Sequence, residues 1–345
     1  MKKGGKIALI IICPILIAIF AIGLGLGLNA KKALDNSEAT LFLSEWQNYI
    51  RDDVLVKNTV IPGSHDAGTE SMMWMAETQN RTIAEQLASG SRYFDLRVWK
   101  KKDGYFIFHG PIKGANFEPI IDDINGFLTA HPSEFLVLDF QKFKGDSQAD
   151  VTSMLLAKLG DKLLKNTTLN SDIDFINNLM VGDARGKCII VWGDTDTVEN
   201  ADFLFWRDND KGTRAGSALV LHSFYFRKYN TLASKDYIKK GLSKYLEMRK
   251  EKPDGLFVLQ GQLTDPVLVL GPKAIEALHN KNMSEYLYHF DYSAHQLNIV
   301  MRDYIGPRKC FEILVANLAY NNIKPALLAD FRANIPTDLL GRFVA

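Results

Sequence analysis

Apolar residues along this chain form short continuous runs that are separated by stretches with helical spacing. Continuous apolar runs are typical of strands that are buried on both faces of a parallel sheet. Eight such runs are found, at residues 55–61, 92–98, 105–109, 135–140, 187–192, 218–222, 256–260 and 298–304. The intervening helical patterns include residues 82–88, 120–129, 150–164, 236–250 and 273–278, and a lead-in helix is predicted at residues 41–50.

Eight strands that alternate with helices predict an α/β fold, a distorted (β/α)8 TIM-like barrel, because eight is the number of strands that closes such a barrel. The second and third strands lie too close in sequence for a helix between them, so we expect the barrel to be irregular there. An open doubly wound sheet is the alternative. No linker rich in proline or serine divides the chain beyond residue 40, so we predict a single domain over residues 41–345.

The N-terminal region has a different pattern from the rest of the chain. Residues 7–28 are uncharged and apolar and follow Lys2, Lys3 and Lys6, and about 20 such residues suffice to cross a bilayer. We therefore expect a membrane anchor or uncleaved signal at residues 1–30 and a polar linker at residues 31–40. The leading lysines favour a single-pass protein with a cytoplasmic N-terminus and an extracytoplasmic domain. Secretion after signal cleavage is the alternative.

Composition narrows the possible functions. The 345 residues include 47% hydrophobic and 23% charged residues and have a formal net charge of +1, so a large basic surface for nucleic acid is not expected. The three cysteines, Cys13, Cys188 and Cys310, are too far apart for a zinc motif or a readable disulfide framework. We expect a monomer that needs no cofactor.

Charged residues lie at the ends of several of the apolar strands. The turn at residues 60–69 holds His65 and Asp66 after the first strand, and His109 ends the third. In the second strand the alternation of side chains places Asp95 and Arg97 on one face. The fourth strand ends in Asp139, and the last ends in Arg302 and Asp303. Because buried charges are costly unless they are paired, we expect these residues to converge on one site.

Two histidines, an arginine and several aspartates can cleave a phosphodiester without a metal. One histidine takes a proton from an attacking hydroxyl while the other gives a proton to the leaving oxygen. The arginine stabilises the charge on the phosphorus-bound oxygens.

Four motifs in this order resemble the X region of phosphatidylinositol-specific phospholipases C, above all the metal-independent bacterial enzymes and the small proteins that consist of the X domain alone. They are residues 60–69, 86–97, 108–110 and 131–134. The resemblance implies a distorted TIM barrel and the cleavage of a phosphatidylinositol-type lipid, or its glycosylated form, by attack of the inositol 2-hydroxyl. The products would be diacylglycerol and a cyclic inositol phosphate.

The resemblance also implies roles for individual residues. His65 would be the general base, partnered by Asp303, and His109 the general acid, partnered by Asp66. Arg97 matches the arginine that stands where calcium sits in the eukaryotic enzymes, so no metal is expected.

The residues expected to contact the substrate match the bacterial family less well than the catalytic residues do. Asp95 corresponds to the acidic residue beside the arginine, but the lysine and arginine that touch the inositol ring in the bacterial enzymes are not found at their expected places. Those places hold Gln141 or Lys142, and residues 192–194. We therefore expect substrate contacts from Asp95, Asp139, Lys142, Asp194 and Gln260, and the head group stays open.

The segment after the first strand favours contact with a lipid surface. Met72, Met73, Trp74 and Met75 follow one another where the bacterial family has a short interfacial helix, and these residue types suit a membrane interface. A buried methionine-rich segment is the alternative reading.

Two other functions fit the same fold. One is a metal-dependent glycerophosphodiesterase or sphingomyelinase D-like enzyme, which Arg97 disfavours because it takes the place of a carboxylate. The other is a non-catalytic protein that binds a lipid or an inositol phosphate, which the presence of both histidines and of Arg97 disfavours.

Overall fold

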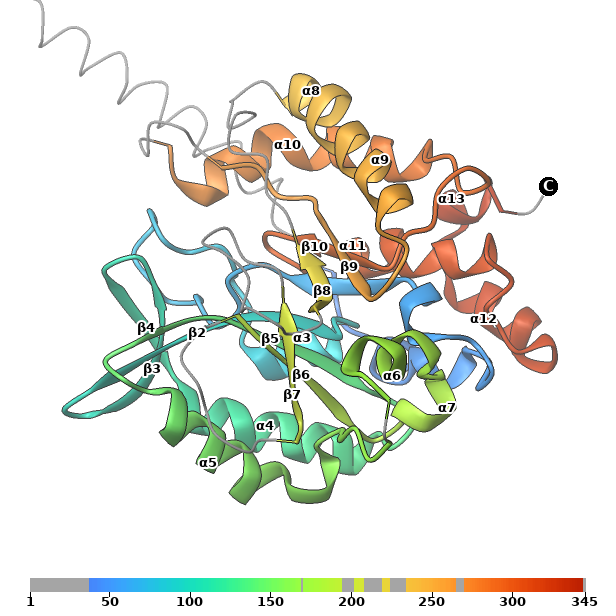
Figure 1. Ribbon diagram of the computed structural model, residues 1–345. Coiled ribbons are helices and arrows are strands. Elements are labelled where there is room, and N and C mark those ends of the chain that lie inside the picture. The colour runs from blue at the N-terminus through green and yellow to red at the C-terminus, as the bar shows by residue number, and fades with distance from the viewer. Residues whose placement is uncertain are drawn as a thin grey trace, which may run out of the picture.

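Eight parallel strands close into a barrel in the computed structural model, which describes residues 37–168, 170–193, 202–207, 219–223, 234–264 and 270–343 (Figure 1). The barrel order is β1, β2, β5, β6, β7, β8, β9 and β10, and pairing of β10 and β2 with β1 closes it. The strands are β1 (Ile61–Ser64), β2 (Tyr93–Lys101), β5 (Leu136–Lys144), β6 (Cys188–Trp192), β7 (Leu204–Arg207), β8 (Leu219–Ser223), β9 (Leu256–Gln260) and β10 (Ile299–Arg302). The predicted closed barrel is confirmed and the open sheet is excluded.

Helices cover the outside of the barrel. They include α3 (Ile83–Ala88), α4 (Phe117–Ala130), α5 (Gln148–Leu159), α6 (Asp172–Asn178), α7 (Val181–Ala184), α9 (Ser243–Glu251), α10 (Gly271–Tyr288), α11 (Pro307–Leu314), α12 (Leu328–Asn334) and α13 (Thr337–Leu340). Short α8 (Ser234–Asp236) and the π-helical η6 (Tyr237–Leu242) lead into α9. The lead-in segment is two short turns, α2 (Leu41–Ser44) and η2 (Trp46–Tyr49), rather than one helix.

The third predicted strand does not belong to the barrel. It is β3 (Gly104–His109), which pairs antiparallel with β2 and with β4 (Ile112–Asn116). A two-residue turn joins β2 to β3, so the chain reverses instead of crossing over. β7 supplies the remaining barrel strand. Sequence analysis missed it because its apolar run, residues 203–206, is short and lies between charged residues, Asp202 and Arg207.

β1 begins later than the sequence pattern predicts. The 3₁₀ turn η3 (Val56–Asn58) occupies the start of the predicted strand. The side-chain amide of Asn317 then accepts a hydrogen bond from the Val60 N–H and donates one to the Val60 carbonyl, both at 3.0 Å. The parallel ladder therefore starts at Ile61, and His65 comes directly after its end.

The predicted membrane location is corrected. Among the described residues no helix is both long and apolar enough to cross a bilayer. Residues 7–28, on which the anchor and the single-pass location were based, lie outside the described part of the chain. The single-pass location therefore has no support in the structure and is withdrawn.

Candidate functional site

His65, Asp66, Arg97, His109 and Asp303 converge at the carboxyl-terminal end of the barrel. His65 and Asp66 follow β1, Arg97 lies on β2, His109 ends β3 and Asp303 follows β10. The three carboxylates around the site, those of Asp66, Asp95 and Asp303, are at most 3% exposed, whereas the side chains of His65 and His109 are 14% and 29% exposed. The two imidazoles can therefore meet a substrate while the carboxylates orient them from below.

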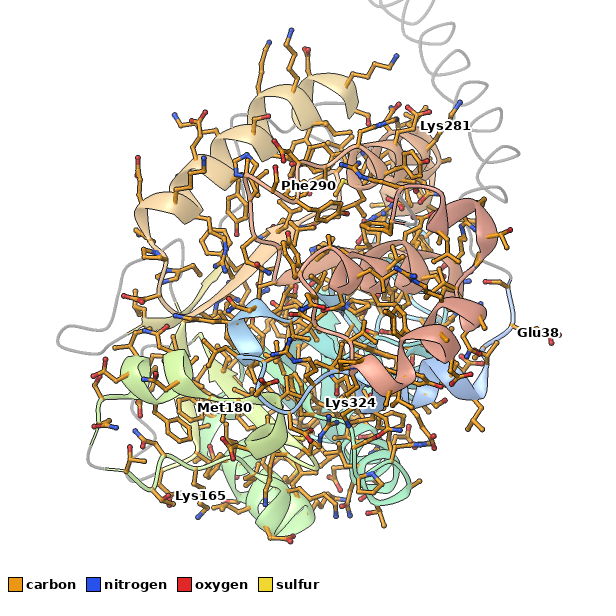
Figure 2. All side chains as sticks on the ribbon, turned by 90° about the vertical axis from the view of Figure 1, so that its right-hand side faces the viewer. Glu38, Lys165, Met180, Lys281, Phe290 and Lys324 are labelled. Carbon is orange, nitrogen blue, oxygen red and sulfur yellow. The ribbon has the colours of Figure 1, made fainter. Side chains whose placement is uncertain are left out.

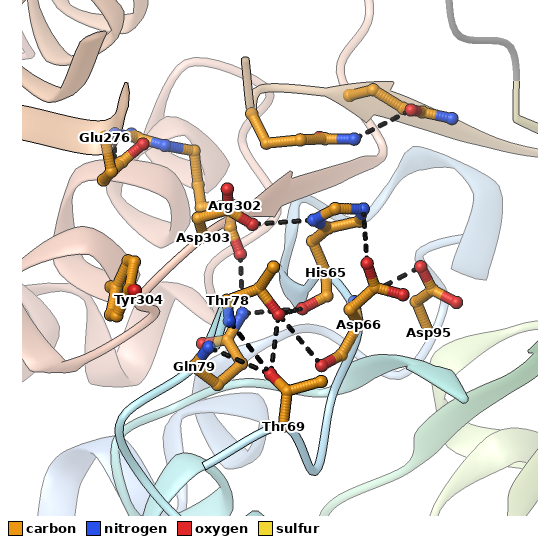
Figure 3. Close-up of polar contacts among 12 residues, drawn as sticks. His65, Asp66, Thr69, Thr78, Gln79, Asp95, Glu276, Arg302, Asp303 and Tyr304 are labelled. Carbon is orange, nitrogen blue, oxygen red and sulfur yellow. Dashed lines mark hydrogen bonds and ion pairs between the residues drawn. The ribbon is translucent and has the colours of Figure 1, made fainter. Parts of the chain in front are cut away.

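His65 lies between two carboxylates (Figure 3). Its Nδ1 donates to Asp303 Oδ1 at 2.6 Å, and its Nε2 lies 3.2 Å from Asp66 Oδ2. Burial opposes protonation of the ring, but the negative charges of Asp66 and Asp303 outweigh it and raise the pKa of His65 from 6.5 to about 9. Burial raises the pKa of the Asp303 carboxyl, and the His65 charge opposes that rise.

Asp66 connects the two histidines with Arg97. Its Oδ2 lies 3.6 Å from His109 Nε2, and its Oδ1 lies 2.6 Å from an Arg97 Nη1 nitrogen. Although burial favours the neutral carboxyl, Arg97 and the two histidines lower the pKa of Asp66 to about 2. Asp66 therefore stays ionised and holds three cationic or protonatable side chains at one point.

Asp95 completes the pairing of Arg97. Arg97 Nη2 donates to Asp95 Oδ2 at 3.2 Å, and the same oxygen accepts from the backbone N–H of Asp66 at 3.3 Å. Asp95 and Arg97 thus share one face of β2, as the alternation predicts. His65, Asp66 and Asp95 could together hold a metal ion, but the Arg97 guanidinium already lies against both carboxylates.

Local backbone geometry aims these side chains. Asp66 and Tyr304 both have positive φ, 44° and 46°, a region that non-glycine residues adopt only when the surroundings hold them there. Thr78 and Gln79 supply that support, because their side chains donate to the His65 carbonyl at 3.3 and 2.8 Å. The Thr69 hydroxyl accepts from the backbone N–H groups of Thr78 and Gln79, each at 3.1 Å. Sequence analysis did not identify these supporting residues, because threonine and glutamine in a loop carry no distinctive pattern.

His109 is oriented by a different contact. Its Nδ1–H donates to the Ala76 carbonyl at 2.8 Å, which directs Nε2 toward Asp66. The turn that contains Met73, Trp74 and Met75 is therefore fixed to the site, and these three side chains are 52%, 58% and 45% exposed. Met72 is only 6% exposed and does not share their surface, so its assignment to the lipid-facing group is corrected.

The residues that were expected to contact the substrate lie in different environments. Asp139 is buried against the Tyr93 hydroxyl at 2.5 Å and Arg207 at 2.9 Å, and burial raises its pKa to about 6 against the effect of Arg207. Gln260 is buried and donates to Ser223. Lys142 is exposed, pairs in register with Arg97 and lowers the pKa of Asp66 through its charge.

Two further polar residues of the predicted set have other positions. Asp194 lies outside the described residues. Arg302 points away from His65 and donates to Glu276 and Asn280, so only its backbone serves the site, through the bond from the His65 N–H to its carbonyl. Arg207, which sequence analysis missed with β7, reaches the same interior through Asp139.

Comparisons with known proteins show which family residues 56–192 resemble. Residues 56–192 match the family model "Phosphatidylinositol-specific phospholipase C, X domain". A 1-phosphatidylinositol phosphodiesterase of Listeria monocytogenes is 30% identical over 118 residues, which are 32% of this chain and 35% of that protein. PI-PLC X domain-containing protein 2 of Mus musculus is 35% identical over 123 residues, 26% of this chain and 36% of the relative. The chain thus spans about a third of the length of the curated relatives it matches.

Solved structures give a broader match. The phosphatidylinositol-specific phospholipase C from Listeria monocytogenes superimposes with a TM-score of 0.63 at 20% identity and covers 80% of this chain and 98% of its own. A Staphylococcus aureus phosphatidylinositol-specific phospholipase C gives a TM-score of 0.53 at 15% identity, with 76% and 91% covered. At these identities the likeness concerns the fold. Residues 56–192 are therefore similar to the X domain of phosphatidylinositol-specific phospholipases C, and the barrel around them has the fold of the bacterial enzymes.

Proposed function

We propose that this chain cleaves the phosphodiester bond of a phosphatidylinositol-type lipid by attack of the inositol 2-hydroxyl. The observation that carries the proposal is a pair of partly exposed imidazoles that face one buried carboxylate, which Arg97 holds in place. That arrangement provides a proton acceptor, a proton donor and a fixed positive charge within one small space.

In the proposed reaction, a residue of the site assists each bond that forms or breaks. The 2-hydroxyl oxygen attacks phosphorus and its proton passes to His65 Nε2, while Asp303 holds Nδ1. The bond from phosphorus to the glycerol oxygen breaks, and His109 Nε2 gives that oxygen a proton. Arg97 stabilises the negative charge on the phosphorus-bound oxygens as phosphorus becomes five-coordinate. The products are diacylglycerol and a cyclic inositol phosphate.

The same geometry suits a reaction without a metal. Arg97 lies 2.6 Å from Asp66 and 3.2 Å from Asp95, where it supplies the positive charge that a cation would otherwise bring. The metal-dependent alternative uses the grouping of His65, Asp66 and Asp95 as ligands. Cleavage of phosphatidylinositol in detergent micelles with excess EDTA distinguishes the two, since loss of activity would favour the metal-dependent reaction.

The roles of the two histidines are tested by their variants and by the leaving group. We expect His65→Ala and His109→Ala each to lower kcat by about 10²–10⁴-fold, the usual contribution of general acid–base catalysis. An inositol phosphodiester of p-nitrophenol needs no protonation of its leaving group, so it should restore activity to His109→Ala and not to His65→Ala. His289→Ala, on an exposed histidine at the end of α10, is the control. Equal rescue of both variants would contradict the assignment of His65 as the base and His109 as the acid.

A further inference from the structure

An arm of four strands leaves the barrel on the side of the candidate site. It consists of the end of β2, the hairpin β3 and β4, and the end of β5, and we call residues 98–116 and 142–146 the basic arm. The arm extends to one side of the barrel in Figure 1. At about 3.3 Å per residue, Lys101 lies about 20 Å beyond Asp95 along β2. The tip of the arm therefore projects past the end of the barrel that carries the site.

Lysines gather on this arm. Lys100, Lys102, Lys113, Lys142 and Lys144 are exposed and Lys101 is half-buried. Lys100 pairs with Asp150 at 2.6 Å and Lys113 with Asp103 at 3.1 Å. Lys101, Lys102 and Lys144 have no salt bridge with any residue that the structure describes. The arm therefore keeps an excess of positive charge on a chain whose formal net charge is only +1.

Aromatic rings hold these charges together. The ammonium groups of Lys101 and Lys144 lie 3.7 and 3.8 Å from the centre of the Trp99 ring. Lys113 lies 3.8 Å from the centre of the Phe106 ring. Cation–π attraction of this kind offsets part of the repulsion between neighbouring like charges. The lysines are thus positioned by the arm itself.

The tip of the arm carries a shallow, open depression. It is lined by Lys100, Lys101, Lys102, Asp103 and Gly145. Gly145 has a φ of +73°, and a Cβ there would come within 2.5 Å of the Lys100 carbonyl oxygen. Glycine therefore lets the end of β5 lie close against the backbone of β2 at the tip of the arm.

We infer that the basic arm is an electrostatic docking surface for an anionic lipid bilayer and brings the site against the membrane. Charge complementarity supports this partner, because lysines near an anionic bilayer are attracted to it. The exposed Met73, Trp74 and Met75 support it further, because their turn is bonded to His109 through the Ala76 carbonyl. Cationic and apolar groups together at one end of a protein fit a lipid interface better than they fit the surface of an acidic protein partner. The inference rests on the proposed cleavage of a lipid.

The test replaces three lysines without touching the proposed acid–base residues. The variant Lys101→Gln/Lys102→Gln/Lys144→Gln is compared with Lys165→Gln/Lys281→Gln/Lys324→Gln, which removes the same charge. The latter three lysines are labelled in Figure 2, on the side of the molecule turned away from the arm in Figure 1. Full-length chains are assayed on phosphatidylinositol in detergent micelles that are rich in phosphatidylglycerol or in phosphatidylcholine.

Each lysine near an anionic surface contributes about fivefold to binding, or about 1 kcal/mol. We therefore expect the arm variant to lose up to about 100-fold of the preference for phosphatidylglycerol at low salt, and the control variant to keep it. High salt should weaken the preference of the wild type as well, because it screens exposed charges. An arm variant that keeps the full preference, or a control that loses as much, would overturn the inference.

A second substrate and a second readout separate this inference from the proposed function. Monomeric short-chain phosphatidylinositol needs no docking, so both lysine variants should cleave it at the wild-type rate. If the wild type cleaves neither substrate, the proposed function fails, and docking is measured without turnover. Brominated phosphatidylglycerol should then quench Trp99 fluorescence, taken as the difference from Trp99→Phe, more than brominated phosphatidylcholine does. Equal quenching, or tighter binding of polyglutamate than of phosphatidylglycerol micelles, would rule out the lipid surface.

Discussion

The charge on His65 is set by two aspartates, and this has a consequence for the pH dependence of activity. As the proposed general base His65 must lose its proton before it acts, while the proposed general acid His109 must keep one. Deprotonation of His65, whose pKa is about 9, should therefore limit kcat/KM on the acidic side of its optimum. Asp303→Asn removes a negative charge 2.6 Å from Nδ1. We expect the midpoint of the acidic limb to move down by about one pH unit or more, with a lower maximum because the ring is less well oriented. An unchanged midpoint in the pH profile of kcat/KM would show that Asp303 does not tune the base.

Arg97 offers a test of geometry at the same scale. Its guanidinium contacts Asp66 and Asp95 through different nitrogens, a pattern that a lysine ammonium cannot reproduce. We expect Arg97→Lys to lower kcat by about 10²-fold, or about 3 kcal/mol of transition-state stabilisation, with a small change in KM. The decisive comparison uses a phosphorothioate substrate. A wild-type preference for one stereoisomer that persists in Arg97→Lys would show that Arg97 does not contact the phosphorus-bound oxygens.

At the scale of elements, one buried ion pair fastens the amino-terminal segment to the barrel. Arg92 and Glu134 are fully buried and 2.8 Å apart, and Arg92 also donates to the carbonyls of Leu43, Ser44 and Leu87. Glu134 belongs to the motif at residues 131–134 that contributed to the family resemblance. In the structure Glu134 precedes β5 and holds Arg92 against α2 and α3, at the end of the barrel opposite the site.

Removing one partner of this pair should destabilise the fold. Glu134→Ala leaves the Arg92 charge buried without its carboxylate, and such losses cost about 3–5 kcal/mol. We expect chemical denaturation to show that decrease, while kcat of the folded fraction stays within about twofold of the wild type. The exposed pair of Lys158 and Asp122 is the control, and Asp122→Ala should cost less than about 1 kcal/mol. A similar decrease in the free energy of unfolding in both variants would show that the buried pair stabilises the fold no more than an exposed pair does.

The strands also show which parts of the fold and of the site could be predicted from the sequence. Strands such as β6 and the first half of β5 are recognisable because burial on both faces makes the run almost entirely apolar. β7 was missed, and with it Arg207, because its apolar run at residues 203–206 is flanked by charged residues on both sides. Periodicity identified β3 as a strand but could not give its direction. The direction depends on the length of the connection to β2, and a two-residue turn makes the pair antiparallel. The site aspartates and histidines were found because charge at the end of an apolar strand is unusual, whereas Thr78 and Gln79 have no such signal.

At the scale of the whole molecule, the site should contribute to stability as well as to the proposed chemistry, because the pKa of His65 differs between the folded and unfolded states. Its pKa is about 9 in the folded protein and 6.5 when exposed. A raised folded pKa stabilises the fold fully below about pH 6.5, and the contribution is lost as pH rises through 9. The shift corresponds to about 3 kcal/mol. We expect the free energy of unfolding of the wild type to exceed that of His65→Gln by an amount that shrinks by about this much between pH 6 and pH 10.

The opposite sign applies to Asp66, and the two groups together define a pH window. Its folded pKa is about 2 against an ordinary 3.8, so its contribution is present above about pH 3.8 and is lost as pH falls through 2. The ion pairs of the site should therefore stabilise the barrel most between about pH 4 and 6.5, below the pH at which His65 becomes a free base. The conditions of greatest stability and of greatest activity then differ. Denaturation curves and kcat/KM measured on one preparation across pH 4–10 check this, and coincident maxima would show that His65 is not the base.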